Sequence, residues 1–272
     1  MTSFTMGPAL LFCPADRPDR FEKAAARADA VILDLEDAVA PEHKAAARDA
    51  LTASTLDPAR TIVRVNSFDS GYFADDVVAL AHTPYRMVMV PKAESAEQLS
   101  GLSRYTIIAL CETARGVLQA PSIAAVPHVL ALMWGAEDLV ASLGGSSSRF
   151  DDGSYRDVAR HARSSVLLAA GAAGKAAIDA VHVDIADTAG LDSEARDAAA
   201  SGFAATAVIH PSQVETVRSA FHPTEAELDW ARRVSAAAAS NGGVFRLDGR
   251  MVDGPVVRHA ERVLARARPT MD

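Results

Sequence analysis

The sequence predicts an α/β protein, a (β/α)8 TIM barrel with a C-terminal helical and hairpin extension. Short runs that are apolar on both faces recur along the chain, as expected for strands of a parallel sheet covered by helices. Alanine-rich amphipathic stretches separate these runs, and eight such units fill about 215 residues, a usual size for this barrel. An open, doubly wound sheet is the rival architecture. It usually has a Gly-rich phosphate turn after its first strand, where this chain reads CPADRPDR.

Each strand is predicted from a β-rich run bounded by turn or helix signals. In chain order these runs are 9–14, 30–35, 61–66, 86–91, 106–112, 128–135, 180–185 and 206–211. The predicted helices between them include 19–28, 42–51 and 154–174. Because segment 142–155 is polar and rich in Gly and Ser, we expect it to form a mobile loop on the active face.

The region after residue 220 lies outside the eight repeats. We therefore predict a barrel over residues 1–220, which carries the metal and substrate site, and an extension over 221–272. Within the extension we expect a helix capped by Thr224, a short hairpin around Asp248-Gly249 and a last helix. An extension of this kind must pack on the barrel, on a neighbouring subunit or on both.

Composition excludes several classes of partner. The chain has 272 residues, 49% of them hydrophobic, and a net charge of −8 without any basic tract, so neither nucleic acid nor an anionic membrane is expected to bind it. Its apolar runs are shorter than the roughly 18 residues that a membrane span requires. The N-terminal MTSFTMGPAL lacks a basic segment, so we expect no signal peptide and a cytoplasmic location. Cys13 and Cys111 lie in apolar runs and are expected to be buried and reduced.

Polar residues follow every predicted strand, and this raises the question of why a buried run such as AVILDL should end in acids. Residues at the same phase of each strand–helix unit project onto the C-terminal rim of a barrel, where active sites form. The acids therefore belong at the barrel mouth and not in the core. The rim residues are Asp16, Arg17, Glu36, Asp37, Arg64, Asn66, Lys92, Glu94, Glu112, Glu137, Asp138, Asp184, Asp187 and His210.

Glu112 and Asp138 follow adjacent strands and are the predicted metal ligands. A hard cation such as Mg²⁺ takes one or two protein carboxylates and completes its shell with water and substrate. Zinc is not expected, because the chain has no His pair at zinc spacing and its cysteines have no nearby partner. Arg64 can hold a carboxylate or an oxyanion in its planar fork. Together these groups predict an α-oxo or α-hydroxy acid as substrate.

Other interpretations of these residues stay open from the sequence alone. Glu112 and Asp138 can be salt-bridged rim residues, and Lys92 can be a Schiff-base lysine. Asp34 can hold loop backbone or touch a ligand, while His210 before Pro211 is more typical of a structural turn. A further open choice concerns the basic residues after the first strand, which can bind CoA phosphates or form a solvated face: Arg17, Arg20 and Lys23.

At this point the residues resemble a known family. The segments that carry the resemblance are LFCPADRPDRFEKA, VILDLEDAVAPEHKAAAR, RVNS, MVPKAES, CETARG, WGAEDL, IHPSQ and GRMVDGP, in order over nearly the whole chain. They resemble the citrate lyase beta subunit and its stand-alone relatives in the HpcH/HpaI aldolase superfamily, which also includes malyl-CoA and citramalyl-CoA lyases. The resemblance implies a (β/α)8 barrel with a C-terminal lid that often covers a neighbouring subunit's site, in a homo-oligomer (trimer or hexamer).

The resemblance also implies roles for individual residues. The family's Mg²⁺ ligands fall on Glu112 and Asp138, its substrate arginine on Arg64, and its acid–base aspartate on Asp253 in GRMVDGP. We predict that the substrate also contacts Glu112 and three further rim residues, Asp37, Lys92 and Arg17.

Two departures bear on the branch of the family. CoA-independent aldolases resemble D-x-E-H at the second strand, with the His as base, whereas this chain reads Asp34-Leu35-Glu36-Asp37. The missing His and the lid aspartate favour the CoA-thioester branch. Cys111 replaces a usual aliphatic residue, and we attach no redox role to it.

The activity implied is a Mg²⁺-dependent carbon–carbon lyase that cleaves or forms a 3-hydroxyacyl-CoA, with acetyl-CoA and an oxo acid (oxaloacetate, pyruvate or glyoxylate) as the other partners. Three alternatives remain: a citryl-carrier subunit of a citrate lyase complex, a CoA-independent pyruvate aldolase and a non-catalytic protein that binds CoA metabolites. We expect segments 66–72 and 184–187 to set the acyl preference.

Overall fold

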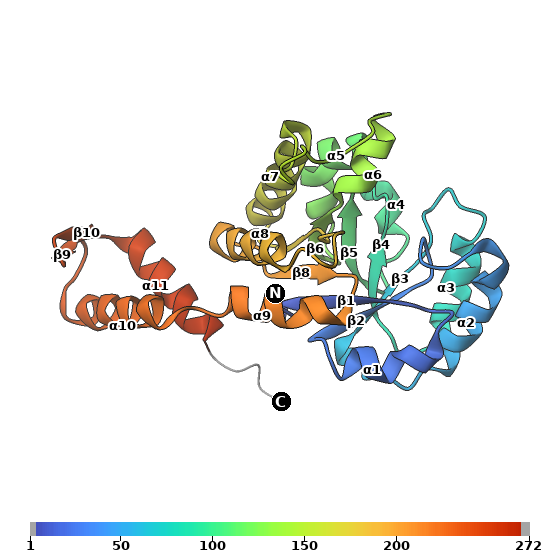
Figure 1. Cartoon of the computed structure of the whole chain (residues 1–272), viewed down its shortest axis with the longest axis horizontal. Helices are drawn as coiled ribbons and strands as arrows, with labels where there is room; N and C mark the ends of the chain where they lie inside the picture. The colour runs from blue at the N-terminus through green and yellow to red at the C-terminus, as the bar shows by residue number, and fades with distance from the viewer. Residues whose placement is uncertain (1–3, 268–272) are drawn as a thin grey trace. The chain divides into compact units, whose positions relative to one another are not determined.

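The computed structural model describes residues 4–267 and contains a closed barrel of eight parallel strands (Figure 1). Each strand pairs with the next, and the eighth pairs with the first, so the sheet has no free edge. The barrel strands are β1 (Ala9–Pro14), β2 (Ala30–Asp34), β3 (Thr61–Arg64), β4 (Met87–Val90), β5 (Thr106–Cys111), β6 (Val129–Trp134), β7 (Ala176–Asp179) and β8 (Ala205–Val208). The predicted fold class is confirmed.

Helices lie outside the strands and connect them (Figure 1). The α-helices of this part are α1 (Phe21–Ala25), α2 (Lys44–Ala53), α3 (Phe73–Ala81), α4 (Ala96–Ser100), α5 (Ala114–Ala124), α6 (Ala136–Ser142), α7 (Asp157–Ala172), α8 (Thr188–Ser201) and α9 (Val214–Phe221). Short 3-10 turns precede some of them: η1 (Pro18–Arg20), η2 (Pro41–His43), η3 (Pro58–Arg60) and η4 (Pro211–Gln213). Within the described residues, none of these helices is long and apolar enough to cross a membrane.

The seventh strand was predicted at the wrong place. We expected it at 180–185, but β7 covers 176–179 and residues 180–187 form the loop that leads to α8. Gly174 ends α7 with φ +66°, so the chain enters the sheet two residues later and pairs there with β6 and β8. Two consecutive apolar stretches look alike in sequence, and only the register with neighbouring strands distinguishes them. Asp184 and Asp187 are therefore loop residues, and Asp187 is the N-cap of α8.

The barrel interior is a packed apolar core. Side chains from all eight strands fill it, as in other barrels of this size. Its fully buried members include Leu10, Ile32, Ile62, Met89, Ile108 and Ile178. Both cysteines are buried and free, and burial raises the pKa of Cys13 to about 11 and that of Cys111 to about 12. Burial thus favours the neutral thiol over the thiolate at both positions.

The chain divides into two compact units, Met1–Val217 and Arg218–Asp272. The second unit contains α10 (Glu225–Ser240), the hairpin strands β9 (Phe245–Leu247) and β10 (Arg250–Val252), and α11 (Gly254–Arg266). Thr224 caps α10 in a capping box with Glu227, as predicted. Asp248 and Gly249 both have positive φ, as the two-residue turn of a hairpin requires. The unit has its own apolar cluster, which includes Leu228, Val234, Val252, Ala260 and Val263.

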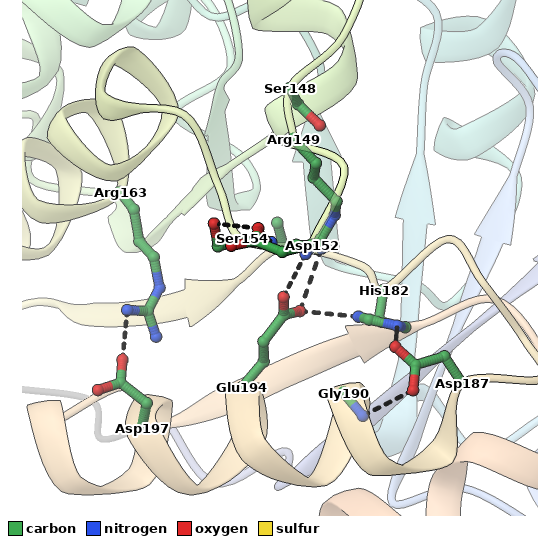
Figure 2. Close-up of polar contacts among 12 residues, drawn as sticks. Ser148, Arg149, Asp152, Ser154, Arg163, His182, Asp187, Gly190, Glu194 and Asp197 are labelled. Atoms are coloured by element: carbon green, nitrogen blue, oxygen red, sulfur yellow. Dashed lines mark hydrogen bonds and ion pairs between the residues drawn. The ribbon is translucent and has the colours of Figure 1, made fainter.

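The loop after α6 is anchored by polar contacts to α8 (Figure 2). Arg149 forms an ion pair with Glu194 and lies 3.8 Å from the centre of the Tyr155 ring. Tyr155 in turn packs edge-on against Trp134 of β6. The loop that we expected to be mobile is thus fastened to the barrel wall at Arg149.

His182 in the β7–α8 loop extends this network, and Figure 2 shows its ring between two carboxylates. Its Nδ1 lies 2.9 Å from Glu194 and its Nε2 lies 3.3 Å from Asp187. The hydrogen bond to Glu194 raises the pKa of His182 against the opposing effects of burial and of Arg149. His182 therefore joins this loop to α8 through both of its ring nitrogens.

This arrangement predicts a pH-dependent contribution to stability. Because the folded pKa of His182 is raised, its stabilisation is fully present below the unfolded value of about 6.5 and is lost as pH rises through the folded pKa. We expect His182→Gln to lower the free energy of unfolding by about 1.5–3 kcal/mol at pH 6, the range for hydrogen bonds to charged groups, and by less at pH 9. Urea unfolding at both pH values measures this. The exposed His161→Gln is the control, and a difference that grows toward pH 9 would contradict the prediction.

Candidate active site

The centre of the rim is an ion pair between neighbouring strands. Asp34 ends β2 and Arg64 ends β3, and the strand register places them directly side by side. Arg64 donates from Nε and Nη2 to the two oxygens of Asp34, both at 2.7 Å. Asp34 is fully buried and also accepts from the backbone amides of Glu36 and Ala38. It therefore both orients Arg64 and holds the loop that follows β2.

A second polar layer supports this loop from behind. The buried ammonium of Lys44 donates to the carbonyls of Leu35 and Glu36 and to Asn66 Oδ1, at 2.6 to 2.8 Å. The Asn66 amide donates to the buried Asp76 carboxylate at 2.6 Å. Because these groups satisfy one another, the backbone between β2 and α2 is held rigidly below the rim.

Lys92 lies at the centre of a carboxylate cluster. Its Nζ is 2.6 Å from Glu36, 3.3 Å from Asp138, 3.7 Å from Asp37 and 3.9 Å from Glu112. These carboxylates raise the pKa of Lys92 against the opposing effect of its own burial. A Schiff-base lysine needs a neutral amine, so this environment opposes the Schiff-base interpretation of Lys92.

Glu112 is buried in an environment that favours a bound cation. Burial, together with the charges of Asp138 and Glu36, raises the pKa of Glu112 to about 8 against the opposing charges of Lys92 and Arg64. Gly135 makes room for it, because a Cβ there would lie 2.7 Å from Glu112 Oε2. Glu36 Oε2 is also buried without a hydrogen bond in the described chain, although Arg64 Nη1 is 3.0 Å away.

The donor set fits Mg²⁺ and not a fully protein-bound metal. Within residues 4–267 no group of three or more His, Cys, Asp or Glu side chains is placed to hold a metal alone. Glu112 and Asp138 could supply the one or two carboxylate ligands that Mg²⁺ usually takes from protein, and substrate and water would complete its shell. Asp138 is half-exposed in the first turn of α6, so a metal there can be reached from solvent.

These groups open onto a cavity of about 300 Å³ at the barrel mouth. Its polar lining includes Asp34, Asp37, Arg64, Glu112 and Asp138. Its apolar wall is made by Phe12, Leu110, Met133, Val181 and Ile209. Segments 66–72 and 184–187, which we expected to set the acyl preference, do not contribute to this lining. The apolar wall of this cavity comes instead from residues in or just after the barrel strands.

Three residues singled out in the sequence lie elsewhere or have other contacts. Arg17 is exposed and pairs with Asp19 at 3.1 Å, outside the cavity lining. His210 is a turn residue, since its ring accepts from the Ser212 amide. Asp253 lies in the second unit, where its side chain caps α11 by accepting from the Val256 amide at 3.3 Å.

Sequence reasoning gave too little weight to the supporting acids and to Lys44. Glu36 appeared only as one acid among several. Asp34 was left between holding the loop backbone and touching a ligand, and the structure shows that it holds the backbone and also pairs with Arg64. The sequence contains a sign of the role of Lys44, because this lysine falls on the same face of α2 as the buried Ala47 and Leu51. In the structure Lys44 is itself buried. An alternation pattern shows such a residue but does not show what it binds.

Comparison with known proteins places the chain among relatives of like length and fold. A profile described as HpcH/HpaI aldolase/citrate lyase matches residues 9–211. A citrate lyase subunit beta-like protein of Mycobacterium tuberculosis is 59% identical over 261 residues, which cover 96% of each chain. A (3S)-malyl-CoA thioesterase of Cereibacter sphaeroides is 36% identical over 272 residues, covering 95% of this chain and 94% of the relative.

A solved structure agrees with these sequence matches. The crystal structure of protein CitE from Mycobacterium tuberculosis, in complex with magnesium, acetoacetate and coenzyme A, superposes with a TM-score of 0.93 at 59% identity. The match covers 96% of this chain and 98% of that one. The same protein has been solved with magnesium and pyruvate, at a TM-score of 0.84 and 54% identity, covering 95% of this chain and 98% of that one.

The buried ion pair gives a direct prediction. Asp34→Asn removes the bidentate counter-ion of the buried Arg64 and leaves it with Glu36, at 3.0 Å, so we expect the free energy of unfolding to fall by about 3 kcal/mol, the low end for breaking a buried pair. The matched control is Asp19→Asn, which removes the carboxylate from the exposed Arg17–Asp19 pair of similar geometry and should cause no measurable change. Urea unfolding of both variants measures this, and equal small effects would show that burial does not determine the strength of the pair.

Proposed function

Because the chain belongs to the HpcH/HpaI aldolase/citrate lyase family, we propose that it is a Mg²⁺-dependent carbon–carbon lyase that cleaves or forms a 3-hydroxyacyl-CoA thioester. The products of cleavage are acetyl-CoA and a small oxo acid. The observation that carries the proposal is the buried carboxylate of Glu112, which lines one cavity together with Asp138 and Arg64. This cavity has the size and the charges to bind the acid half of such a substrate.

Glu112 and Asp138 hold the metal in this proposal. When bound, Mg²⁺ supplies Lewis-acid stabilisation of negative charge on the oxygens of the substrate. Two carboxylates neutralise the ion and leave the rest of its coordination shell to the substrate.

Arg64 stabilises the oxyanion that develops as the carbon–carbon bond breaks. Its guanidinium lines the cavity and is fixed by Asp34, so it needs no rearrangement when charge appears. The Phe12 ring lies 4.8 Å from Arg64 Cζ and excludes water from one face of the group. Asp37 lines the same cavity and adds a polar contact to the acid half of the substrate. Lys92 is not part of the lining but lies 3.3 Å from Asp138, which is, so its charge acts on the substrate from just behind the wall.

Asp253 supplies the proton to the enolate carbon of acetyl-CoA, or removes it in the condensing direction. This role rests on the resemblance of GRMVDGP to the family's lid. The carboxylate of Asp253 is only partly buried and makes one long hydrogen bond, so it keeps acceptor capacity for a substrate. We further propose that the chain acts in a homotrimer or larger assembly in which this lid serves a neighbouring subunit.

The alternatives are separated by specific features. A CoA-independent aldolase is opposed by Asp37 in place of a His. A non-catalytic binding protein is opposed by the presence of Arg64, Glu112 and Asp138 around one cavity. A citryl-carrier subunit would use the same residues with partner chains, so only turnover by the isolated chain distinguishes it.

The activity is tested with the purified chain alone. Malyl-CoA, citramalyl-CoA and citryl-CoA are supplied with Mg²⁺, and acetyl-CoA and free CoA are measured separately, with EDTA as control. We expect acetyl-CoA release that EDTA abolishes. Free CoA without acetyl-CoA would instead indicate thioester hydrolysis, the activity for which a 36% identical relative is named. Absence of turnover on all three would favour the carrier-dependent subunit.

Glu112→Gln tests the metal site in the same assay. Gln has the shape of Glu, and its side-chain oxygen can still accept a hydrogen bond from the backbone amide of Lys92, which lies 3.1 Å from Glu112 Oε1 in the wild type. The variant should therefore fold. We expect Mg²⁺ affinity to fall by more than about 100-fold, the upper limit for outer-shell substitutions, and cleavage to fall with it. Calorimetric titration with MgCl₂ measures the affinity. The exposed Glu97→Gln is the control, and full metal-dependent cleavage by folded Glu112→Gln would refute the assignment.

Asp253→Asn tests the lid. Asn is also a good N-cap, so α11 should be retained while the proton donor is lost. We expect cleavage to fall at least about 100-fold, the low end for loss of a general acid–base group, with Mg²⁺ binding unchanged. If the lid serves a neighbour, co-expressed Asp253→Asn and Glu112→Gln chains, purified through two different tags, should regain activity. Inactive mixed assemblies would overturn the shared site.

A further inference from the structure

Lys92 has a backbone conformation that a lysine rarely adopts. Its φ is +49°, in the left-handed region, and within residues 4–267 the one other non-glycine residue with positive φ is Asp248 in the hairpin turn. Aspartate is tolerated in such turns, whereas lysine has no special reason to be there. A strained conformation of this kind persists where surrounding contacts require it, often at functional sites. At Lys92 those contacts are carboxylates.

The backbone amide and the side-chain ammonium of Lys92 both contact the carboxylates proposed to bind the metal. The amide of Lys92 donates to Glu112 Oε1 at 3.1 Å. The ammonium of the same residue lies 3.9 Å from that oxygen and 3.3 Å from Asp138 Oδ1. Both carboxylates proposed to hold the metal are therefore bound by this one residue.

The shortest contact of the ammonium is with the loop after β2. The ammonium lies 2.6 Å from Glu36 Oε1 and 3.7 Å from Asp37 Oδ2, on the opposite loop. The side chain of Lys92 is 31% exposed, so its flexible stem is free to shift between the two acid pairs. One positive charge is thus shared by four carboxylates, two on each side.

We propose that the Lys92 ammonium, hydrogen-bonded to Glu36, also compensates the charges of Glu112 and Asp138 in the metal-free protein, and that it moves away from these two and stays with Glu36 and Asp37 when Mg²⁺ binds. Lys92 is then a positioning residue that preserves the site without metal and lowers its affinity for metal. This inference rests on the proposed metal site, and it adds that the affinity is set by competition with an internal cation.

If Lys92 competes with the metal, removing its charge should raise the Mg²⁺ affinity, whereas a purely structural role predicts a lower affinity. If Lys92 only supported the site, its loss would weaken metal binding. If its charge competes, the loss removes repulsion of the incoming ion, and Mg²⁺ should bind more tightly by about tenfold or more. Without metal, the same variant should be less stable, because Glu112 and Asp138 then repel each other uncompensated.

The experiment uses the full chain, stripped of metal with EDTA and dialysed. Calorimetric titration with MgCl₂ gives the dissociation constant for Lys92→Met, Lys92→Arg and the wild type, and thermal unfolding is recorded with and without Mg²⁺. Lys92→Met keeps the side-chain length and the Cβ but loses the charge, while Lys92→Arg keeps the charge. Lys175→Met, before β7 at the other end of the barrel, is the matched control.

We expect the dissociation constant to fall about tenfold in Lys92→Met and to stay within about twofold of the wild type in Lys92→Arg and Lys175→Met. The gain in melting temperature on adding Mg²⁺ should be largest for Lys92→Met. Unchanged or weaker binding by Lys92→Met, with the wild type binding Mg²⁺, would overturn this inference and leave the proposed function standing. Failure of the wild type to bind Mg²⁺ would overturn both.

Discussion

The site depends on the buried ion pair between Asp34 and Arg64. Because these residues are register partners on adjacent parallel strands, the pairing of β2 with β3 brings them together without any help from loops. The same Asp34 carboxylate also accepts hydrogen bonds from the backbone amides of Glu36 and Ala38. The ion pair with Arg64 therefore also determines how the chain leaves β2. Arg64 and the acids after Asp34 are placed by one interaction.

Burial of charge is the constraint that shapes the rest of the rim. Glu36 and Glu112 are almost fully enclosed, and enclosure raises the pKa of both. Such carboxylates stay charged only if cations compensate them. Arg64 and Lys92 supply part of this compensation, and the donor set suits a divalent ion for the remainder. The same electrostatic demand thus accounts for the lysine in the site and for the expected metal.

The barrel and the second unit divide the proposed chemistry. Metal ligands and the oxyanion arginine lie on strand ends or the first turn of a helix, which are rigid elements held by the core. The proposed proton donor lies at the start of α11, in a unit with its own small apolar cluster.

Local pattern in the sequence determined the eight strand–helix units, the extension with its Thr224 cap and Asp248-Gly249 turn, and the gathering of Arg64, Glu112 and Asp138 on one rim. These follow from the alternation of apolar runs, turn residues and phase within each unit, which are short-range properties. Only the tertiary structure decided that β7 lies at 176–179, that Asp34 pairs with Arg64, and that Lys92 lies among four carboxylates. Those facts depend on strand register and on contacts between residues up to 56 positions apart, which no local pattern contains.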